Sequence, residues 1–164
     1  MNPRATRSKP RILGIDPGFD RLGLAVIEGD PSRPFHIWSD CVSPAKGTDE
    51  ERLAAVYAAV EDAIRAHEPV AISLETLYFS TNKKTAIAVA QARGAVVACA
   101  GAHGLPLLEF SPGQVKLAVT GYGAADKKAI ALMVPKLIAL PAKKRLDDEL
   151  DAIAIAIAGL STHR

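Results

Sequence analysis

An uninterrupted apolar segment near the C-terminus, Ala152–Leu160, follows directly on a short acidic stretch, Asp147–Asp151. The segment reads AIAIAIAGL and would leave no polar face on a helix, so it predicts a helix packed inside a hydrophobic core. Asp148 and Asp151 stand three residues apart and would project from the same side of the first turn. Ionised carboxylates at the start of a buried helix cost free energy unless a cation lies between them.

Two further acids end apolar runs elsewhere in the chain. Asp16 follows Ile12–Ile15 and Glu75 follows Val70–Leu74, and both runs are typical of buried strands. A helical segment precedes the second run, and a crossover of that kind favours parallel pairing with a neighbouring strand. If the two strands are neighbours, about 4.8 Å apart, Asp16 and Glu75 can reach one common ion.

Together these four acids predict a site for divalent metal. Mg²⁺ prefers hard oxygen ligands and keeps several waters. A carboxylate cluster of this size can hold two ions about 3.5–4 Å apart, which activate a water molecule and stabilise the leaving oxygen of a phosphodiester. The alternative is that each acid merely ends a strand or begins a helix, where acids are common. Asp147 and Glu149 are expected to point away from the Asp148–Asp151 side and to be solvated.

The distribution of charge favours a polyanionic partner. The chain has 164 residues, 49% of them hydrophobic, and a net charge of only +2. Residues 111–145 nevertheless contain seven basic residues and one acid. Positive charge of this kind around a cluster of acids suits a polyanion better than a small cation. Residues 1–10 are expected to form a flexible basic tail, and residues 11–164 one globular domain.

No segment predicts passage into or through a membrane. The basic N-terminus is not followed by the apolar stretch of a signal peptide, and no apolar run approaches the ~20 residues that a membrane helix needs. Cys41 and Cys99 lack the spacing of a zinc site or a disulfide framework, which favours a reducing compartment. A cytoplasmic protein without a membrane partner is therefore expected.

The predicted elements are those of an α/β protein with five strands. Strands are predicted at 11–16, 22–28, 35–42, 70–75 and 106–110, the first three as an antiparallel meander. Helices are predicted at about 49–68, 82–102 and 147–161, with two shorter ones starting at 112 and about 125. Thr48 and Glu51 fit a capping box, Pro112 suits a first helical position, and Pro135 should kink or end its helix.

Five groups of residues, in order along nearly the whole chain, resemble one known family. They are ILGIDPG (12–18), SLETLYFSTN (73–82), QARG (91–94), QVK with TGYG (114–116 and 120–123) and DDELDAIAIAIAG (147–159). GIDPG alone is a weak indication, because similar loops bind phosphate in actin-like and sugar kinases. The full set resembles the RuvC Holliday-junction resolvases, metal-dependent nucleases of the RNase H-like superfamily. The resemblance implies an RNase H-like five-stranded mixed sheet flanked by helices.

The resemblance also implies an activity and its catalytic residues. Asp16, Glu75, Asp148 and Asp151 match the family's catalytic, metal-binding carboxylates. A Mg²⁺-dependent crossover junction endodeoxyribonuclease is therefore expected, with two ions per active site and Mn²⁺ able to substitute. Such an enzyme would resolve four-way DNA junctions by symmetric paired nicks that leave 5′-phosphate and 3′-hydroxyl ends.

Four more residues match positions that contact DNA in the family. Tyr78 matches an aromatic position used against bases at the junction, and stacking on unpaired bases contributes roughly 1–3 kcal/mol per base. The adjacent Phe79 either does the same or packs within the protein. Lys116 and Lys127 match basic positions near the active site, where they would contact phosphates or stabilise transition-state charge; simple solvated lysines are the alternative.

Partners follow from the same resemblance. RuvC-like resolvases are two-fold dimers, so a homodimer on four-way junction DNA is expected, beside branch-migration motor proteins. The predicted helix 82–102 is apolar most of the way round, which indicates burial either in this dimer interface or within one subunit.

Three other functions compete with this interpretation. The first is an RNase H-like nuclease that acts on RNA or RNA–DNA duplex, which the sequence separates only weakly from a junction resolvase. The second is an actin-like ATPase, but that fold needs a second domain with another phosphate loop, for which 164 residues leave no room. The third is a junction-binding protein without catalysis, which Asp148 and Asp151 disfavour.

Overall fold

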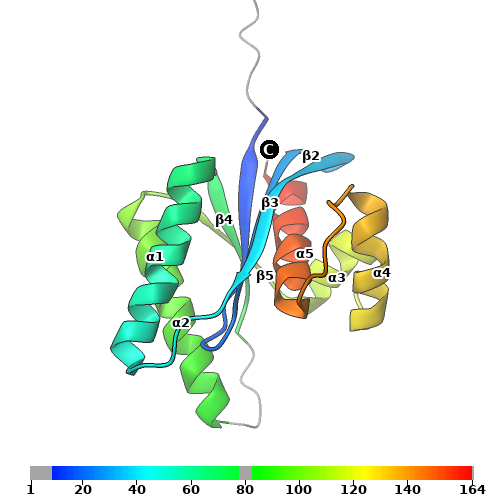
Figure 1. The fold of residues 1–164 in the computed structure, drawn as a ribbon. Coiled ribbons are helices and arrows are strands. Elements are labelled where there is room, and N and C mark those ends of the chain that lie inside the picture. The colour runs from blue at the N-terminus through cyan, green and yellow to red at the C-terminus, as the bar shows by residue number, and fades with distance from the viewer. Residues whose placement is uncertain (1–8, 78–82, 164) are drawn as a thin grey trace, which may run out of the picture.

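The computed structural model describes residues 9–77 and 83–163, and it confirms the predicted α/β class (Figure 1). Within these ranges the chain forms five strands: β1 (Arg11–Asp16), β2 (Leu22–Asp30), β3 (Arg33–Val42), β4 (Ala71–Glu75) and β5 (Leu107–Phe110). The same ranges contain five helices: α1 (Asp49–His67), α2 (Lys83–Ala102), α3 (Pro112–Thr120), α4 (Lys127–Leu137) and α5 (Asp147–Thr162). Each strand and helix expected from the sequence is therefore present, with ends that differ by a few residues.

The five strands form one mixed sheet in the order β3-β2-β1-β4-β5. β1 and β3 are each antiparallel to β2, whereas β4 runs parallel to β1 and β5 runs parallel to β4. Crossover helices produce the parallel half, since α1 connects β3 to β4 and α2 connects β4 to β5. The carboxyl ends of β1, β4 and β5 consequently lie at the same edge of the sheet.

Helices cover both faces of this sheet (Figure 1). α1 and α2 lie against one face, and α3, α4 and α5 lie on the other, with α5 packed across β1 and β2. Successive residues of a strand point to opposite faces, so β1 contributes to two separate cores. Leu13 and Ile15 pack with α1 and α2, and Ile12 packs with α5.

Glycines allow α5 to lie directly on the sheet. A Cβ atom on Gly14 would overlap the backbone of Ala152, and a Cβ atom on Gly23 would overlap the carbonyl group of Asp148. All residues of the apolar segment 152–160 are buried, as the sequence predicts. The first turn of α5 is therefore held close to the ends of β1 and β2.

Local sequence signals place most helix ends. Thr48 caps α1 in a capping box with Glu51, and Pro112 occupies the first turn of α3. Pro135 lies inside α4, which ends two residues later at Leu137. A proline has no backbone N–H, so position 135 donates no hydrogen bond to the residue four positions earlier. Among residues 9–77 and 83–163, no helix combines the length and the apolar character needed to cross a bilayer.

Candidate active site

Two of the predicted acids end neighbouring parallel strands. The register of β1 and β4 pairs Ile15 with Leu74, so the next residues, Asp16 and Glu75, lie side by side at the carboxyl edge of the sheet. Both are partly buried. The first and fourth strands are therefore parallel neighbours, which is the condition for Asp16 and Glu75 to reach one common ion.

The other two predicted acids come from the start of α5. In the register of β1 and β2, Asp16 pairs with Gly23, and Gly23 faces the backbone of Asp148. The first turn of α5 is thus positioned beside the end of β1. Asp151 follows three residues later, in the direction of β4 and Glu75, and its charge affects both strand-borne acids.

A hollow of about 290 Å³ opens between these elements. Three of the predicted acids line it, Asp16, Glu75 and Asp151, together with Lys116 from α3 and Lys127 from α4. Apolar side chains of α3, α4 and α5 complete the wall. We call this space, lined by these three acids and two lysines, the acidic hollow. It brings together residues from five separate elements of the chain.

The acidic hollow contains more negative charge than the protein neutralises. Burial and the charges of the three other predicted acids raise the pKa of Asp16 to about 7, and Lys127 only partly opposes this shift. Burial and the charge of Asp151 also raise the pKa of Glu75. An external cation would relieve this repulsion and favour the ionised carboxylates.

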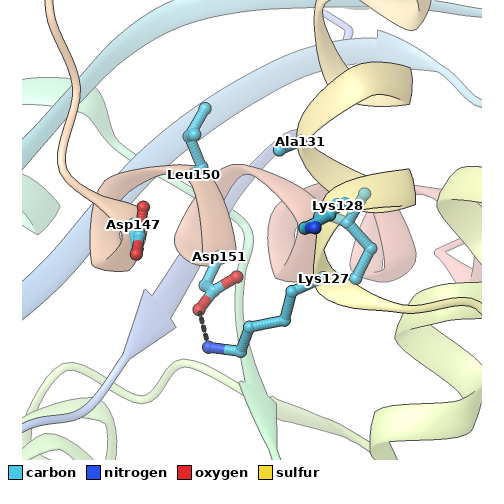
Figure 2. A pocket seen from close by; sticks show the side chains of 7 residues that line it. Lys127, Lys128, Ala131, Asp147, Leu150 and Asp151 are labelled. Carbon is cyan, nitrogen blue, oxygen red and sulfur yellow. Dashed lines mark hydrogen bonds and ion pairs between the residues drawn. The ribbon is translucent and has the colours of Figure 1, made fainter.

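Two basic side chains partly neutralise the acids of α5. Arg21 Nε lies 3.0 Å from Asp148 Oδ2. Lys127 Nζ lies 3.2 Å from Asp151 Oδ2, as Figure 2 shows. The charge and the hydrogen bond of Asp151 raise the pKa of Lys127, which keeps its ammonium group protonated. With these pairs formed, no three His, Cys, Asp or Glu side chains within residues 9–77 and 83–163 are close enough together to hold a metal. Metal binding in this site would therefore require these acids to come closer together than they lie in this structure.

A second hollow, of about 200 Å³, lies beside the first, between α4 and the start of α5 (Figure 2). Lys127 and Lys128 reach it from α4, and Asp147 and Asp151 reach it from α5. Because Lys127 and Asp151 line both spaces, their ion pair forms the boundary between them.

The prediction that Glu149 would be solvated is wrong. Only 3% of the residue is exposed, and its Oε1 atom lies 2.5 Å from Ser39 Oγ, 2.8 Å from Lys143 Nζ and 3.2 Å from Arg145 Nε. Burial would raise the pKa of Glu149, but hydrogen bonds from Lys143 and Ser39 and the two basic charges outweigh it and lower the pKa. We call these four residues the Glu149 clasp. Asp147, in contrast, is exposed as predicted.

The predicted DNA-contacting residues fall into two groups. Lys116 and Lys127 both line the acidic hollow, beside the acids, and their contact with DNA stays a prediction. Tyr78 and Phe79 lie outside the described residues. The aromatic contacts expected at the junction therefore stay predictions.

Sequence reasoning missed Arg21 and the Glu149 clasp. Arg21 stands in the turn after β1, and no spacing in the sequence connects it with Asp148. Arg145 and Glu149 are four residues apart, a spacing at which opposite charges pair on a helix, and this was the one available signal. Lys143 and Arg145 belong to the basic stretch 111–145, which the sequence assigns to a polyanionic partner, yet both pair inside the protein.

Comparisons with known proteins point to one family. The family model described as crossover junction endodeoxyribonuclease RuvC matches residues 12–159. The RuvC protein of Syntrophomonas wolfei is 39% identical over 155 residues, which are 94% of this chain and 90% of that protein. The RuvC protein of Gloeobacter violaceus is 44% identical, over 93% of this chain and 89% of that protein.

Solved structures agree with this assignment. Thermus thermophilus RuvC in complex with Holliday junction substrate has a TM-score of 0.85 and 31% identity, and the match covers 91% of this chain and 92% of that one. A yeast mitochondrial Holliday junction resolvase, at 12% identity and a TM-score of 0.70, shares the fold. The predicted RNase H-like fold is confirmed. The chain belongs to the RuvC family of crossover junction endodeoxyribonucleases.

Proposed function

We propose that this chain is a structure-selective endonuclease that resolves four-way DNA junctions by symmetric paired nicks. Its family and its likeness to the Thermus thermophilus RuvC solved with a Holliday junction support the proposal. The observation that carries it is the acidic hollow, where Asp16, Glu75 and Asp151 meet and the pKa of Asp16 is raised to about 7. Carboxylates that lack sufficient counter-charge within the chain suit a metal-dependent nuclease.

Magnesium is the proposed cofactor, with two ions per site and Mn²⁺ able to substitute. Asp16, Glu75, Asp148 and Asp151 would hold the ions, because carboxylate oxygens are the hard ligands that Mg²⁺ prefers. The unneutralised charge of the hollow supports this fit, whereas Asp148 Oδ2 is already paired with Arg21 at 3.0 Å. When bound, the metal would supply an activated water and stabilise the leaving oxygen.

The basic residues of the site would prepare it for DNA. Lys127 now neutralises Asp151, and its release would free the ammonium group for a phosphate oxygen or for charge that develops in the transition state. Lys116 lines the same hollow and could contact a second phosphate oxygen. Attack of water on phosphorus with departure of the 3′ oxygen would leave 5′-phosphate and 3′-hydroxyl ends.

Tyr78 and Phe79 are proposed to contact bases at the junction. They follow Glu75 by three and four residues in the sequence, so the chain leads into them from the carboxyl edge of β4. Stacking on unpaired bases would add roughly 1–3 kcal/mol per base to binding. This contribution would select branched DNA without taking part in the bond cleavage.

A homodimer is proposed to form through α2. Exposed positions recur along this helix at Ile87, Ala90, Gly94, Ala98 and Gly101, and Ile87 is 62% exposed. A Cβ atom at Gly94 or Gly101 would meet no neighbouring atom, so packing within the subunit does not explain these glycines. Full burial of α2 within one subunit is excluded for its described side chains. A two-fold dimer would offer one active site to each of two opposing strands.

Further proposals concern the surroundings of the enzyme. Residues 11–164 would form the nuclease domain after a basic tail, and the protein would act in the cytoplasm beside branch-migration motor proteins. Cys41 and Cys99 are free thiols, which is compatible with a reducing compartment.

A cleavage assay on three substrates tests the proposed function. We expect paired nicks at symmetric positions of a synthetic four-way junction, in Mg²⁺ but not in EDTA, and little cleavage of a linear duplex with the same sequence. Faster cleavage of an RNA–DNA hybrid than of the junction would support the RNase H-like alternative. Equal cleavage of junction and linear duplex would contradict structure selectivity.

A further inference from the structure

Glu149 occupies a place where a charged side chain is costly. Within the described residues, the buried polar or charged side chains are those of Ser39, Ser73 and Glu149, and two of these three touch each other. Apolar residues of similar size commonly stabilise a core as well as a buried ion pair does. Core stability alone therefore does not account for this arrangement.

The Glu149 clasp joins three segments that are distant in sequence. Ser39 belongs to the edge strand β3, Glu149 to the first turn of α5, and Lys143 and Arg145 to the connection between α4 and α5. Lys143 Nζ also donates a hydrogen bond to the Ser39 carbonyl at 3.0 Å, and Arg145 Nη1 donates one to the Pro141 carbonyl at 2.9 Å. The clasp thus fixes this connection and the start of α5 against β3.

α5 also begins without a side-chain cap. Thr48, Ser111 and Asp126 each accept a hydrogen bond from the first turn of α1, α3 and α4. The corresponding residue of α5 is Leu146, which cannot do so. Helix starts without such a cap tend to fray, because their first N–H groups lack partners. In α5 the contacts of Glu149 anchor the first turn together with the close backbone approach at Gly23.

Glu149 lies between the two candidate metal ligands of α5. It follows Asp148 by one residue and precedes Asp151 by two. Because successive side chains leave a helix about 100° apart, Glu149 projects from the same turn in a different direction. Holding Glu149 against β3 therefore fixes the rotation of the helix start, and with it the direction of both aspartates.

We propose that Glu149 is a positioning residue for metal binding, which acts through Asp148 and Asp151. The inference rests on the proposed function, since it takes these two aspartates as metal ligands. Groups that orient ligands without touching the metal commonly change metal affinity by about 10- to 100-fold. Loss of the Glu149 clasp weakens metal binding and leaves metal-free junction binding unchanged.

Lys143→Ala gives the sharpest test, because positioning and simple charge predict opposite results. Removal of a positive charge near the site should by itself strengthen the binding of a divalent cation. Loss of positioning should weaken it, by about tenfold. The matched control is Lys144→Ala, which removes the same charge from the exposed neighbouring residue. The measurement is calorimetric titration of Mn²⁺ into the full-length, metal-free protein.

Two variants of Glu149 itself provide a second measurement. Glu149→Gln keeps the size of the side chain and its ability to accept hydrogen bonds, so it should retain part of the Mn²⁺ affinity that Glu149→Ala loses. Asp147→Ala is the control for the lost negative charge, since it changes the exposed residue of the same turn. Junction binding in EDTA should match wild type in Glu149→Gln.

The outcomes separate this inference from the proposed function. Equal Mn²⁺ affinity in Lys143→Ala and Lys144→Ala would overturn it, provided that thermal denaturation shows both variants folded. Folding of Lys143→Ala is expected, because 42% of the lysine side chain is already exposed. Absence of Mn²⁺ binding by the wild type would instead contradict the metal site itself, and the inference would fall with it.

Discussion

The acidic hollow and the Glu149 clasp lie on different sides of the first turn of α5, and they treat a buried carboxylate in opposite ways. In the hollow, burial and neighbouring acids raise the pKa of Asp16 to about 7. In the clasp, burial is outweighed by the contacts of Lys143, Ser39 and Arg145, and the pKa of Glu149 is lowered.

The two regions differ in whether the fold itself neutralises the buried negative charge. Glu149 has two basic partners and a hydroxyl donor within the chain, so it needs nothing from solution. Asp16 faces three other acids and only one lysine that opposes them. A carboxylate buried among like charges indicates a binding site, whereas one buried among opposite charges indicates a structural contact.

The largest expected effect comes from Asp16→Asn, which removes the central charge of the hollow. Nicking of a labelled four-way junction should fall below detection, because the site loses a proposed metal ligand. Binding of the junction in EDTA should persist, since fewer negative charges then face the phosphates. The control is Asp147→Asn, at an exposed position. Nicking by Asp16→Asn at a rate near wild type would show that the hollow is not the active site.

The pH dependence of unfolding should distinguish the two carboxylates. The pKa of Asp16 rises from 3.8 to about 7 on folding, so its contribution to stability is complete below its unfolded pKa and is lost as the pH rises through 7. At about 1.4 kcal/mol per pKa unit, the metal-free wild type should lose a few kcal/mol relative to Asp16→Asn as the pH rises. Urea denaturation of both proteins measures the difference.

Glu149 should show the opposite sign. Its pKa is lowered on folding, so its contribution to stability is present above its ordinary value of 4.5 and is lost as the pH falls through the folded value. Wild type should therefore lose its advantage over Glu149→Gln only in acid. For each variant, the free energy of unfolding relative to wild type can be plotted against pH. If the plots for Asp16→Asn and Glu149→Gln had the same slope, the proposed difference between the two carboxylates would be contradicted.

Gly23→Ala should disturb both regions at once. The added Cβ would overlap the carbonyl group of Asp148, so the first turn of α5 must move away from the sheet. Overpacking of this kind costs about 1–3 kcal/mol, which urea denaturation would detect. At Gly113, by comparison, an added Cβ meets only ordinary contact distances, so Gly113→Ala is the control. Equal stability of the two variants would mean that α5 does not depend on this close approach.

The smallest effect is expected for Arg21→Gln. Half of the arginine side chain is exposed, so its ion pair with Asp148 should contribute at most about 1 kcal/mol to stability. The affinity for Mn²⁺ should rise, because a competitor for Asp148 is removed. The sign is opposite to that expected for Lys143→Ala and can be measured in the same titration. A lower affinity would place Arg21 with the residues that position Asp148.

Structural features that depend on residues close together in the sequence were predictable. The AIAIAIAGL segment forms the buried α5, Thr48 with Glu51 forms the capping box of α1, and Pro112 lies in the first turn of α3. The parallel direction of β4 also followed, because a crossover helix favours a return parallel to the neighbouring strand, but the sequence did not show that this neighbour is β1. These elements depend on residues close together in the chain.

Features that depend on distant surfaces were not predictable. Helical spacing places Asp148 and Asp151 on one side of α5, but it does not say what faces Glu149. That surface is Ser39, 110 residues earlier, together with a connection that only the folded chain brings near. Arg21 was missed for the same reason, since the turn after β1 meets α5 only once the helix lies on the sheet.

The glycines beneath α5 also set the distance between the helix and the sheet. At Gly14 and Gly23 the backbone of the strand lies directly against the backbone of α5. Backbone contact, with no side chain between, therefore sets the distance from the strands that bear Asp16 and Glu75 to the helix that bears Asp148 and Asp151. Even one methyl group, the smallest possible addition, would widen it. Two residues that possess no functional group therefore limit how far the backbone of α5 stands from the strands that bear the other acids.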